Sequence, residues 1–469
     1  MTSEHERSLS VPVHGDVVEC DVVVVGGGPA GMSTSLELAG RGFSVVLLEE
    51  SEELGGQYYK QRLGAVREVH GDFRPDGAKM IAEIRGGPTR IETSRVVWGA
   101  TADGTLLTWS SKRGDALAFR GKATVIATGA FERAVPFLGW QLPGVVTPGH
   151  ALHLATCDVE PVGRRVLLAG SGPFLLPVAC ALLDVGVQVV GIAEANRPYR
   201  PSRHALKALA YPARLRELSA YVAKLAIHRV PIWQGTYVES AQGVDQLTSV
   251  QLTSTRSNPA TRTLAVDTLA VGYGFRPATE LLRLLGVECR TDKGTGDVFP
   301  VLDQFGRASV RGVYAAGEVA GIAGVHAAKA RGRMVATAVM ADLGHIRRNS
   351  RRDSREVTRL ERFARLQATL FPAPRDLAAV VPDATQVCRC EGVTAGMIRD
   401  AVTRGWNDIN SAKGATRAGM GPCQGRQCGF AVGSIVAACS SGPLGDPFAA
   451  RFPIKPVPVR ALIGVLDDE

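Results

Sequence analysis

The sequence predicts an α/β fold that contains two Rossmann-like units followed by a small helical module. Three observations lead to this prediction. Segments 22–48 and 166–194, about 140 residues apart, each read as a strand, a glycine-rich turn, a helix and a second strand. Four of the nine cysteines gather within residues 388–428. The length of 469 residues suits about three domains.

The composition narrows the class of protein. With 45% hydrophobic and 21% charged residues the chain is ordinary for a globular protein, which excludes disordered, collagen-like and disulfide-rich miniprotein classes. The net charge of +9 is modest and aromatic residues are only 6%, so we expect no nucleic-acid partner. The start, MTSEHERSLS, lacks the apolar core of a signal peptide. No uncharged apolar stretch approaches the roughly 18 residues of a membrane span. We therefore expect a cytoplasmic protein, associated with a membrane only peripherally, through a respiratory acceptor.

The first unit carries the motif Gly26-x-Gly28-x-x-Gly31 between a run of valines and a helix. Gly26 suits the tight turn, Gly28 lets the backbone approach a pyrophosphate, and Gly31 allows the helix to pack on the strand. Free N–H groups at the helix start favour phosphate. Glu49 ends the next strand, where it can accept hydrogen bonds from a ribose diol. These residues predict a dinucleotide site rather than a glycine-rich turn of a generic α/β domain.

Other segments of the chain resemble the two-dinucleotide-binding-domain flavoproteins. The segments that carry this resemblance are a glycine pair in Gly55-Gly56-Gln57, the loop Ala127-Thr128-Gly129 and the late pair Gly317-Glu318. The resemblance implies FAD at the first site, with Gly56, Gln57, Thr128, Gly129, Gly317 and Glu318 among its binding residues. It also implies that Glu318, where the superfamily has Asp, binds the ribityl chain. The helix that starts near Val325 would direct its N-terminus at the isoalloxazine ring.

The second unit carries a degenerate motif, Gly170-x-Gly172-x-x-Leu175. The third position should be small, and we expect Leu175 to push the helix away from the strand. Glu194 stands where a ribose-binding acid would lie, which favours NAD over NADP. The alternatives at this site stay open: NAD, another nucleotide, or a domain kept for structure or for subunit docking.

No acid–base or nucleophile constellation is recognisable, so the catalytic residues stay unknown. Disulfide-reductase chemistry is excluded because no paired cysteines follow the glycine pair or lie in the second unit. We expect the isolated Cys157 and Cys180 to be small buried residues. Flavin and iron would supply the chemistry, and the protein would supply position and electrostatics.

The C-terminal module reads Cys388-x-Cys390, then 32 residues, then Cys423 and Cys428 with four residues between them. Four thiolates in two pairs can hold a [2Fe–2S] cluster, and we expect one sequence pair per iron. Structural zinc is the competitor, but zinc sites more often use CxxC spacing. We expect Cys439, outside the pattern, to be buried by packing. The spacing resembles the bacterioferritin-associated-ferredoxin-like [2Fe–2S] domain.

Over nearly its whole length the chain resembles the hydrogen cyanide synthase B, opine oxidase A and hydroxyproline dehydrogenase α family. The resemblance rests on ATGAFERAVPFLGWQLPGV, LAVGYGFRP, CRCEGVT and TRAGMGPCQGRQCG, in addition to the motifs above. It implies an FAD and [2Fe–2S] electron-transfer subunit of an amino- or imino-acid dehydrogenase, acting on opines, hydroxyproline, proline or glycine. It implies a partner flavoprotein of the D-amino-acid-oxidase type, which oxidises the C–N bond, and a small [2Fe–2S] protein as an optional third member. The alternatives are a self-contained NADH-dependent reductase and a scaffold without enzyme activity.

The fold class is therefore α/β, with an FAD domain, an inserted NAD-like domain and a small helical [2Fe–2S] domain. The expected boundaries are a leader at 1–19, the FAD domain at 20–155 and 276–345, the NAD-like domain at 156–275, a basic helical linker at 346–380, the [2Fe–2S] domain at 381–442 and an extended Pro-rich tail at 443–469.

Overall fold

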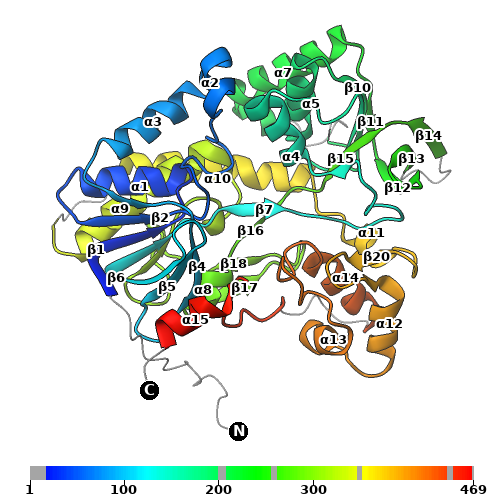
Figure 1. Ribbon diagram of the computed structural model, residues 1–469. Coiled ribbons are helices and arrows are strands. Elements are labelled where there is room, and N and C mark those ends of the chain that lie inside the picture. Colours follow the sequence, from blue (N-terminus) through cyan, green and yellow to red (C-terminus); the bar gives the residue numbers. More distant parts are fainter. Residues whose placement is uncertain (1–16, 199–206, 255–260, 346–350, 441–446, 467–469) are drawn as a thin grey trace.

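The structure is a computed structural model that describes residues 17–198, 207–254, 261–345, 351–440 and 447–466. It consists of two α/β units and a helical module, arranged around the central strand pair of β7 (Ala130–Glu132) and β16 (Phe275–Pro277) (Figure 1). Residues 1–16 of the expected leader lie outside the described residues. The first described element is β1, which begins at Val17.

The first unit is built on a seven-stranded sheet. Its order is β3-β2-β1-β6-β5-β4, and β19 also pairs with β6. Strands β2, β1, β6 and β19 run parallel, as the crossover pattern requires, whereas β4 and β5 add an antiparallel edge. The bounds are β1 Val17–Val25, β2 Val45–Leu48, β3 Arg90–Glu92, β4 Arg95–Ala100, β5 Leu106–Ser110, β6 Asp115–Ile126 and β19 Val313–Ala315.

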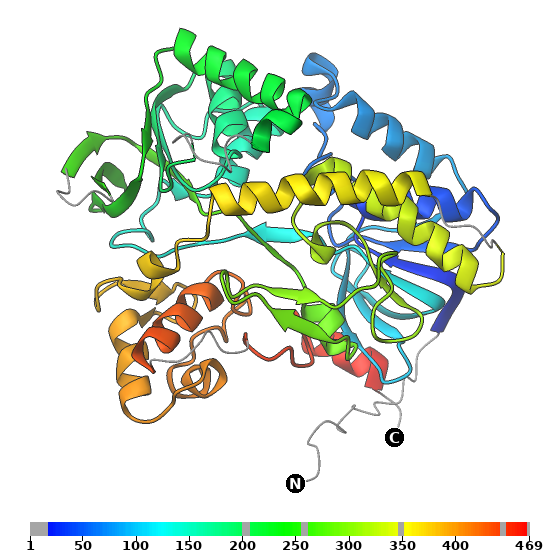
Figure 2. The ribbon, with the colours of Figure 1, turned by 180° about the vertical axis from the view of Figure 1, so that it is seen from behind.

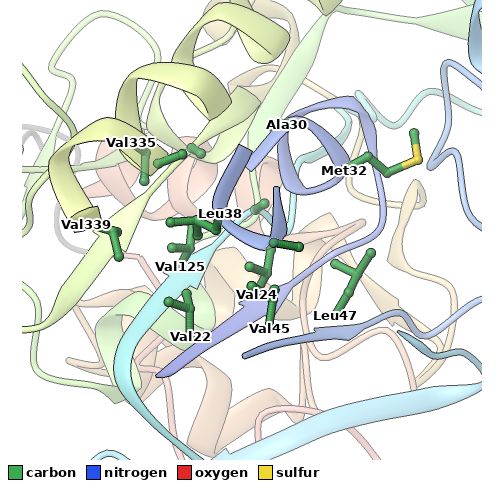
Figure 3. Close-up of a cluster of buried hydrophobic side chains, with 14 of the residues drawn as sticks. Val22, Val24, Ala30, Met32, Leu38, Val45, Leu47, Val125, Val335 and Val339 are labelled. Atoms are coloured by element: carbon green, nitrogen blue, oxygen red, sulfur yellow. The ribbon is translucent and has the colours of Figure 1, made fainter. Parts of the chain in front are cut away.

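Two helices cover one face of this sheet. Val22, Val24 and Leu47 point from the strands toward α1 (Pro29–Ala39) and α9 (Gly324–Asp342) and are fully buried (Figure 3). The helices cross closely at Gly332, where a Cβ would lie 2.4 Å from the Ala30 carbonyl oxygen. This packing places the N-termini of both helices at the carboxyl ends of the strands. The remaining helices of this unit are α2 Gly64–His70, α3 Pro75–Arg85, α8 Glu280–Leu284 and the 3₁₀ turn Gly317–Ala320.

The second unit is a five-stranded sheet in the order β11-β10-β9-β15-β8, next to a separate three-stranded sheet, β12-β13-β14. Val145 and Val146 of β8 pair with β15, so this unit begins about ten residues before the expected boundary at 156. A two-residue edge strand is too short to be recognised from alternation. The bounds are β8 Val145–Val146, α4 Pro148–His153, a π-helical turn Leu154–Asp158, β9 Arg165–Gly170, α5 Leu175–Asp184, β10 Gln188–Glu194, a 3₁₀ turn Ala208–Ala210, α7 Pro212–Ile227, β11 Ile232–Gln234, β12 Thr236–Gly243, β13 Leu247–Ser254, β14 Thr261–Ala265 and β15 Thr268–Gly272.

Helix α10 (Arg351–Leu370) forms the expected linker and runs beside α9, as the long yellow helix of Figure 2. Val357 packs on Ala330 and Met334, and Glu361 pairs with Arg331 at 2.9 Å. The charged linker is therefore anchored on the first unit rather than free. It leads to α11 (Arg375–Ala379) and to the helical module of β20 Gln386–Cys388, β21 Val393–Thr394, α12 Ala395–Thr403, α13 Ile409–Thr416 and α14 Gly429–Cys439.

The tail departs from the expectation of an extended segment. Residues 447–458 are irregular, but Val459–Leu466 form α15. No proline follows Pro458, and Ala461 is fully buried beside Trp98 and Trp109 of the first sheet. The apolar face of the tail therefore packs on the sheet. This packing stabilises a helix that the proline-rich composition of the tail does not predict. Within the described residues, the structure has no helix with the length and apolar character needed to cross a membrane.

The short strand pair β17 (Cys289–Thr291) and β18 (Val298–Pro300) lies between the first sheet and the helical module. Asp297 lies in the connection between these two strands, directly before β18. The first unit, the second unit and the helical module thus meet near one set of loops.

Candidate functional site

The first glycine loop folds as the motif requires. Gly26 has φ of 108°, and a Cβ there would lie 2.3 Å from the Ala127 carbonyl oxygen. A Cβ on Gly31 would lie 1.9 Å from the Gly26 carbonyl oxygen, so only glycine permits this contact between helix and loop. Around Gly28 the nearest atom to such a Cβ is Gly56 Cα at 3.8 Å. The backbone at Gly28, which caps α1, is therefore open toward a ligand, which fits a bound pyrophosphate.

Glu49 lies beside this loop, as the sequence predicts. Its two carboxylate oxygens accept hydrogen bonds from the Gly27 and Ser51 backbone N–H groups, at 2.6 and 2.8 Å. The side chain is buried and fixed by these bonds. A carboxylate has further lone pairs, which remain suited to a ribose diol.

The remaining predicted flavin residues gather around the same strand ends. Gly56 packs directly on the loop, since a Cβ there would lie 2.8 Å from Gly28 Cα, while Gln57 is exposed. Thr128 Oγ1 donates to the Ala278 carbonyl at 2.8 Å, and the Gly129 carbonyl accepts from Ala278 N–H at 3.0 Å. These bonds join the two halves of the first unit, and they leave the ligand roles of Gln57, Thr128 and Gly129 as predictions.

Gly317 and Glu318 follow β19 and precede α9. Gly317 adopts φ of 81° and approaches Ala30 of α1. Glu318 accepts from Gly324 N–H at 3.2 Å, and burial raises the pKa of its carboxyl group. Helix α9 begins at Gly324, one residue before the expected start. A carboxylate thus lies at the helix N-terminus that the sequence assigns to the isoalloxazine side.

The second glycine loop repeats this geometry only in part. Glu194 accepts from the Gly172 and Asn196 N–H groups, both at 2.9 Å, which mirrors Glu49. A Cβ on Gly170 would lie 1.7 Å from the Gly272 carbonyl oxygen, so the tight turn is real. Burial raises the pKa of Glu194 to about 7.

The helix after this loop starts late. Helix α1 begins one residue after Gly28, whereas α5 begins at Leu175, three residues after Gly172. Leu175 is buried in the core of the second unit, and Phe174 packs edge-on against Phe275 at 5.3 Å. The N-terminus of α5 therefore lies two residues further along the chain from its loop than that of α1, and the expected push of the helix away from the strand by Leu175 stays a prediction. Nucleotide binding by Gly170, Gly172 and Glu194 remains a prediction.

The four module cysteines come together, but not in their sequence pairs. Cys390 Sγ lies 3.9 Å from Cys423 Sγ, and the thiol of Cys428 hydrogen bonds to Cys388. The two segments lie against each other, since a Cβ on Gly421 would lie 2.1 Å from Cys390 Cβ. The expectation that each iron takes one sequence pair stays a prediction.

The cysteines of the module differ in their electrostatics: burial raises the pKa of Cys390, and the hydrogen bond to Cys388 raises the pKa of Cys428. The Cys428 thiol, followed by the Gly419, Glu391 and Cys390 backbone N–H groups, lowers the pKa of Cys388 to about 5. Among the described residues no three His, Cys, Asp or Glu side chains surround one ion position. Two sulfur pairs fit a two-iron cluster better than a closed tetrahedral zinc site.

The other five cysteines lie outside this centre, and none of the nine cysteines forms a disulfide. Cys157 and Cys180 are buried, as expected, and burial raises the pKa of both. Cys439 is exposed, which corrects the expectation of packing: it is the last residue of α14, where the helix leaves the module core.

Sequence reasoning missed the contacts that dock the module on the α/β units. Arg133 and Arg276 share the carboxylate of Asp297, the latter at 2.7 Å. Both guanidinium groups face the ring of Phe430, at 5.1 and 5.8 Å from its centroid. No spacing rule links these residues, which come from four separate segments.

A second docking contact involves the cysteine pair itself. Arg389, between Cys388 and Cys390, stacks on Trp140 with its guanidinium carbon 3.9 Å from the ring centroid and donates to the Trp140 carbonyl. The indole N–H donates to the Gln386 carbonyl at 2.5 Å. The FLGW segment and the CRC segment, both visible in the sequence, are therefore partners.

Known proteins resemble this chain over most of its length. The family model described as pyridine nucleotide-disulphide oxidoreductase matches residues 20–340, and the BFD-like [2Fe-2S] binding domain matches residues 386–438. Hydrogen cyanide synthase subunit HcnB of Pseudomonas aeruginosa is 34% identical over 94% of this chain and 97% of its own length. The opine oxidase A protein of Agrobacterium tumefaciens is 31% identical over 94% and 91%.

A solved structure, L-proline dehydrogenase from P. horikoshii, has a TM-score of 0.67 at 22% identity, over 95% of this chain and 80% of that one. At that identity the likeness concerns the fold. The chain thus belongs to the pyridine nucleotide-disulphide oxidoreductase family, in the group of HcnB and opine oxidase A, and is an FAD-dependent oxidoreductase with a BFD-like [2Fe–2S] domain.

Proposed function

We propose that this chain is the electron-relaying subunit of a multi-subunit amino- or imino-acid dehydrogenase. In this complex a partner flavoprotein of the D-amino-acid-oxidase type oxidises the substrate C–N bond, and a small [2Fe–2S] protein is an optional third member. The substrate class comprises opines, hydroxyproline, proline and glycine. Bound FAD exchanges electrons in pairs and a [2Fe–2S] cluster singly, so the chain would join two-electron to one-electron chemistry.

The observation that carries the proposal is the rigid docking of the cysteine module on the flavin unit. Strand β7 follows directly from the Thr128–Gly129 loop and leads to Arg133. Arg133 faces Phe430, which lies two residues after Cys428. The chain that leaves the expected flavin loop therefore reaches, through the buried Arg133 and Phe430, the segment that carries Cys428.

The names of the relatives support the partner. HcnB and opine oxidase A are named as subunits of larger enzymes, and the similar solved structure is an L-proline dehydrogenase. In the described residues no disulfide or paired cysteine lies beside the first glycine loop. This supports a relay rather than a disulfide reductase.

The test is reconstitution. The chain would be purified alone and after co-expression with a flavoprotein subunit of the D-amino-acid-oxidase type, and both samples assayed for dye reduction by proline, hydroxyproline, glycine and an opine. We expect activity only in the complex. Substrate oxidation by the isolated chain at the rate of the complex would overturn the proposal.

A second function has one specific observation in its favour. Glu194 is held by Gly172 N–H as Glu49 is held by Gly27 N–H, so the second unit keeps a ribose-binding carboxylate. A self-contained NADH-dependent reductase would use it. Anaerobic addition of NADH decides between the two: rapid bleaching of the flavin supports the reductase, and no bleaching supports the relay.

A further inference from the structure

A cavity of about 340 Å³ opens where the flavin unit, the cysteine module and the tail meet. Arg276 and Arg283 line it from the flavin unit, Gly425 and Arg426 from the cysteine loop, and residues 447–456 from the tail. It is separate from both glycine loops, and none of the four cluster cysteines lines it.

Cationic side chains outnumber carboxylates among the residues that line the cavity. Its ionisable side chains are six cations and one carboxylate, namely Arg276, Arg283, Lys413, Arg426, Arg451 and Lys455 against Glu280. Phe131, Val298 and Phe448 add apolar surface to the same walls. A cavity of this size with convergent polar groups and apolar walls has the character of a small-molecule site.

Four of the six cations already have partners within the protein. These are Arg276 with Asp297 at 2.7 Å, Arg426 with Glu280 at 3.3 Å, Lys455 with Glu50, and Arg283 with the Phe448 carbonyl at 2.7 Å. These contacts hold the four side chains in place, and carboxylates balance the charges of Arg276, Arg426 and Lys455.

The other two cations, Lys413 of α13 and Arg451 of the tail, pair with no carboxylate among the described residues. Lys413 lies over the Phe448 ring, with Nζ 5.2 Å from its centroid. Burial, and then the nearby Arg451 charge, lowers the pKa of Lys413. Lys413 and the exposed Arg451 line the same cavity, and an anion bound between them would reduce the repulsion between these two like charges.

We propose that this cavity binds a small oxyanion, a carboxylate or a phosphate, between Lys413 and Arg451. The apolar side chains of the walls accept a short hydrocarbon part. Because the anion contacts the flavin unit, the cysteine loop and the tail together, its binding favours their docked arrangement. The proposal does not depend on the substrate of the complex.

The experiment is calorimetric titration of the purified holoprotein at constant ionic strength. Inorganic phosphate and propionate are the two anionic probes, and propionamide is the neutral control. The test variant is Lys413→Gln/Arg451→Gln. The matched control is Arg41→Gln/Arg404→Gln, which removes the same charge at two exposed residues outside the cavity. Flavin and iron contents check that each variant is folded.

We expect saturable binding of at least one anion and none of propionamide. The test variant should bind roughly tenfold or more weakly, since two charge-assisted contacts are lost, and the control should bind as the wild type does. Preference for phosphate or for propionate then assigns the ligand class. If the double variant loses its cofactors, Arg451→Gln alone takes its place under the same criterion. No binding to the wild type, or equal binding by the variant, would overturn the proposal.

Discussion

Replacement of Asp297 by Asn is the sharpest perturbation that the fold offers. The carboxylate pairs with two arginines, and the side chains of Asp297, Arg133 and Arg276 are 4%, 6% and 12% exposed. Asn preserves the shape of the side chain and removes its charge. Two buried guanidinium groups then face each other without the anion that balances them.

The expected loss in the free energy of unfolding depends on the contacts that the two arginines keep. Breaking a buried ion pair by removing one partner costs about 3–5 kcal/mol. Arg133 keeps a hydrogen bond to the Tyr273 carbonyl at 3.0 Å, and Arg276 lines the open cavity, where water can reach it. Both features reduce the cost, so we expect Asp297→Asn to lower the free energy of unfolding by about 3 kcal/mol.

The assay is urea unfolding, followed by flavin fluorescence and by cluster absorbance. The control is Asp184→Asn, which breaks the exposed pair with Lys224 at 2.5 Å and should cost less than about 1 kcal/mol. Because Phe430 lies on the two arginines, the cluster signal should be lost at lower urea than in the wild type. Equal stability of the two variants would refute the reasoning.

Three further predictions test the sites. Cys390→Ser should remove the cluster absorbance and most of about two irons per chain while FAD remains, and Cys439→Ser should remove neither, as iron analysis would reveal. Gly31→Ala should abolish flavin binding, because its Cβ would lie 1.9 Å from a carbonyl oxygen, whereas Gly414→Ala has open space and should leave the flavin spectrum unchanged. Burial raises the pKa of Glu194 to about 7. The folded state therefore binds this proton more tightly than the unfolded state, and the wild type loses stability as the pH rises from about 4.5 to 7. Glu194→Gln should gain on the wild type by up to roughly 3 kcal/mol across that range, and a pH-independent difference would contradict this sign.

Local signals were sufficient for the ligand loops. A glycine that must meet a carbonyl oxygen, as Gly31 meets Gly26, leaves its mark in the sequence because no other residue fits. The same holds for the Cys-x-Cys segment, since thiolate ligands cannot be exchanged for other residue types. Leu175 shows the converse, because a large residue at the third position marks the second motif as degenerate, and α5 begins later after its loop than α1 does.

Long-range packing could not be predicted from the sequence. The closeness of Cys390 to Cys423 depends on how the segment after β20 lies against the loop before α14. Helix α15 exists because Ala461 is buried beside tryptophans of the first sheet, far away in the chain. No composition or spacing rule contains this information.

The sequence by itself determined the two glycine loops, their carboxylates and the four cysteines, because each depends on residue types within a short segment. Only the tertiary structure decided how the parts meet: the shared carboxylate of Asp297, the stacking of Arg389 on Trp140 and the cationic cavity. These depend on residues from distant segments that are ordinary on their own. Charge and stacking acquire their strength only where folding removes water from around them.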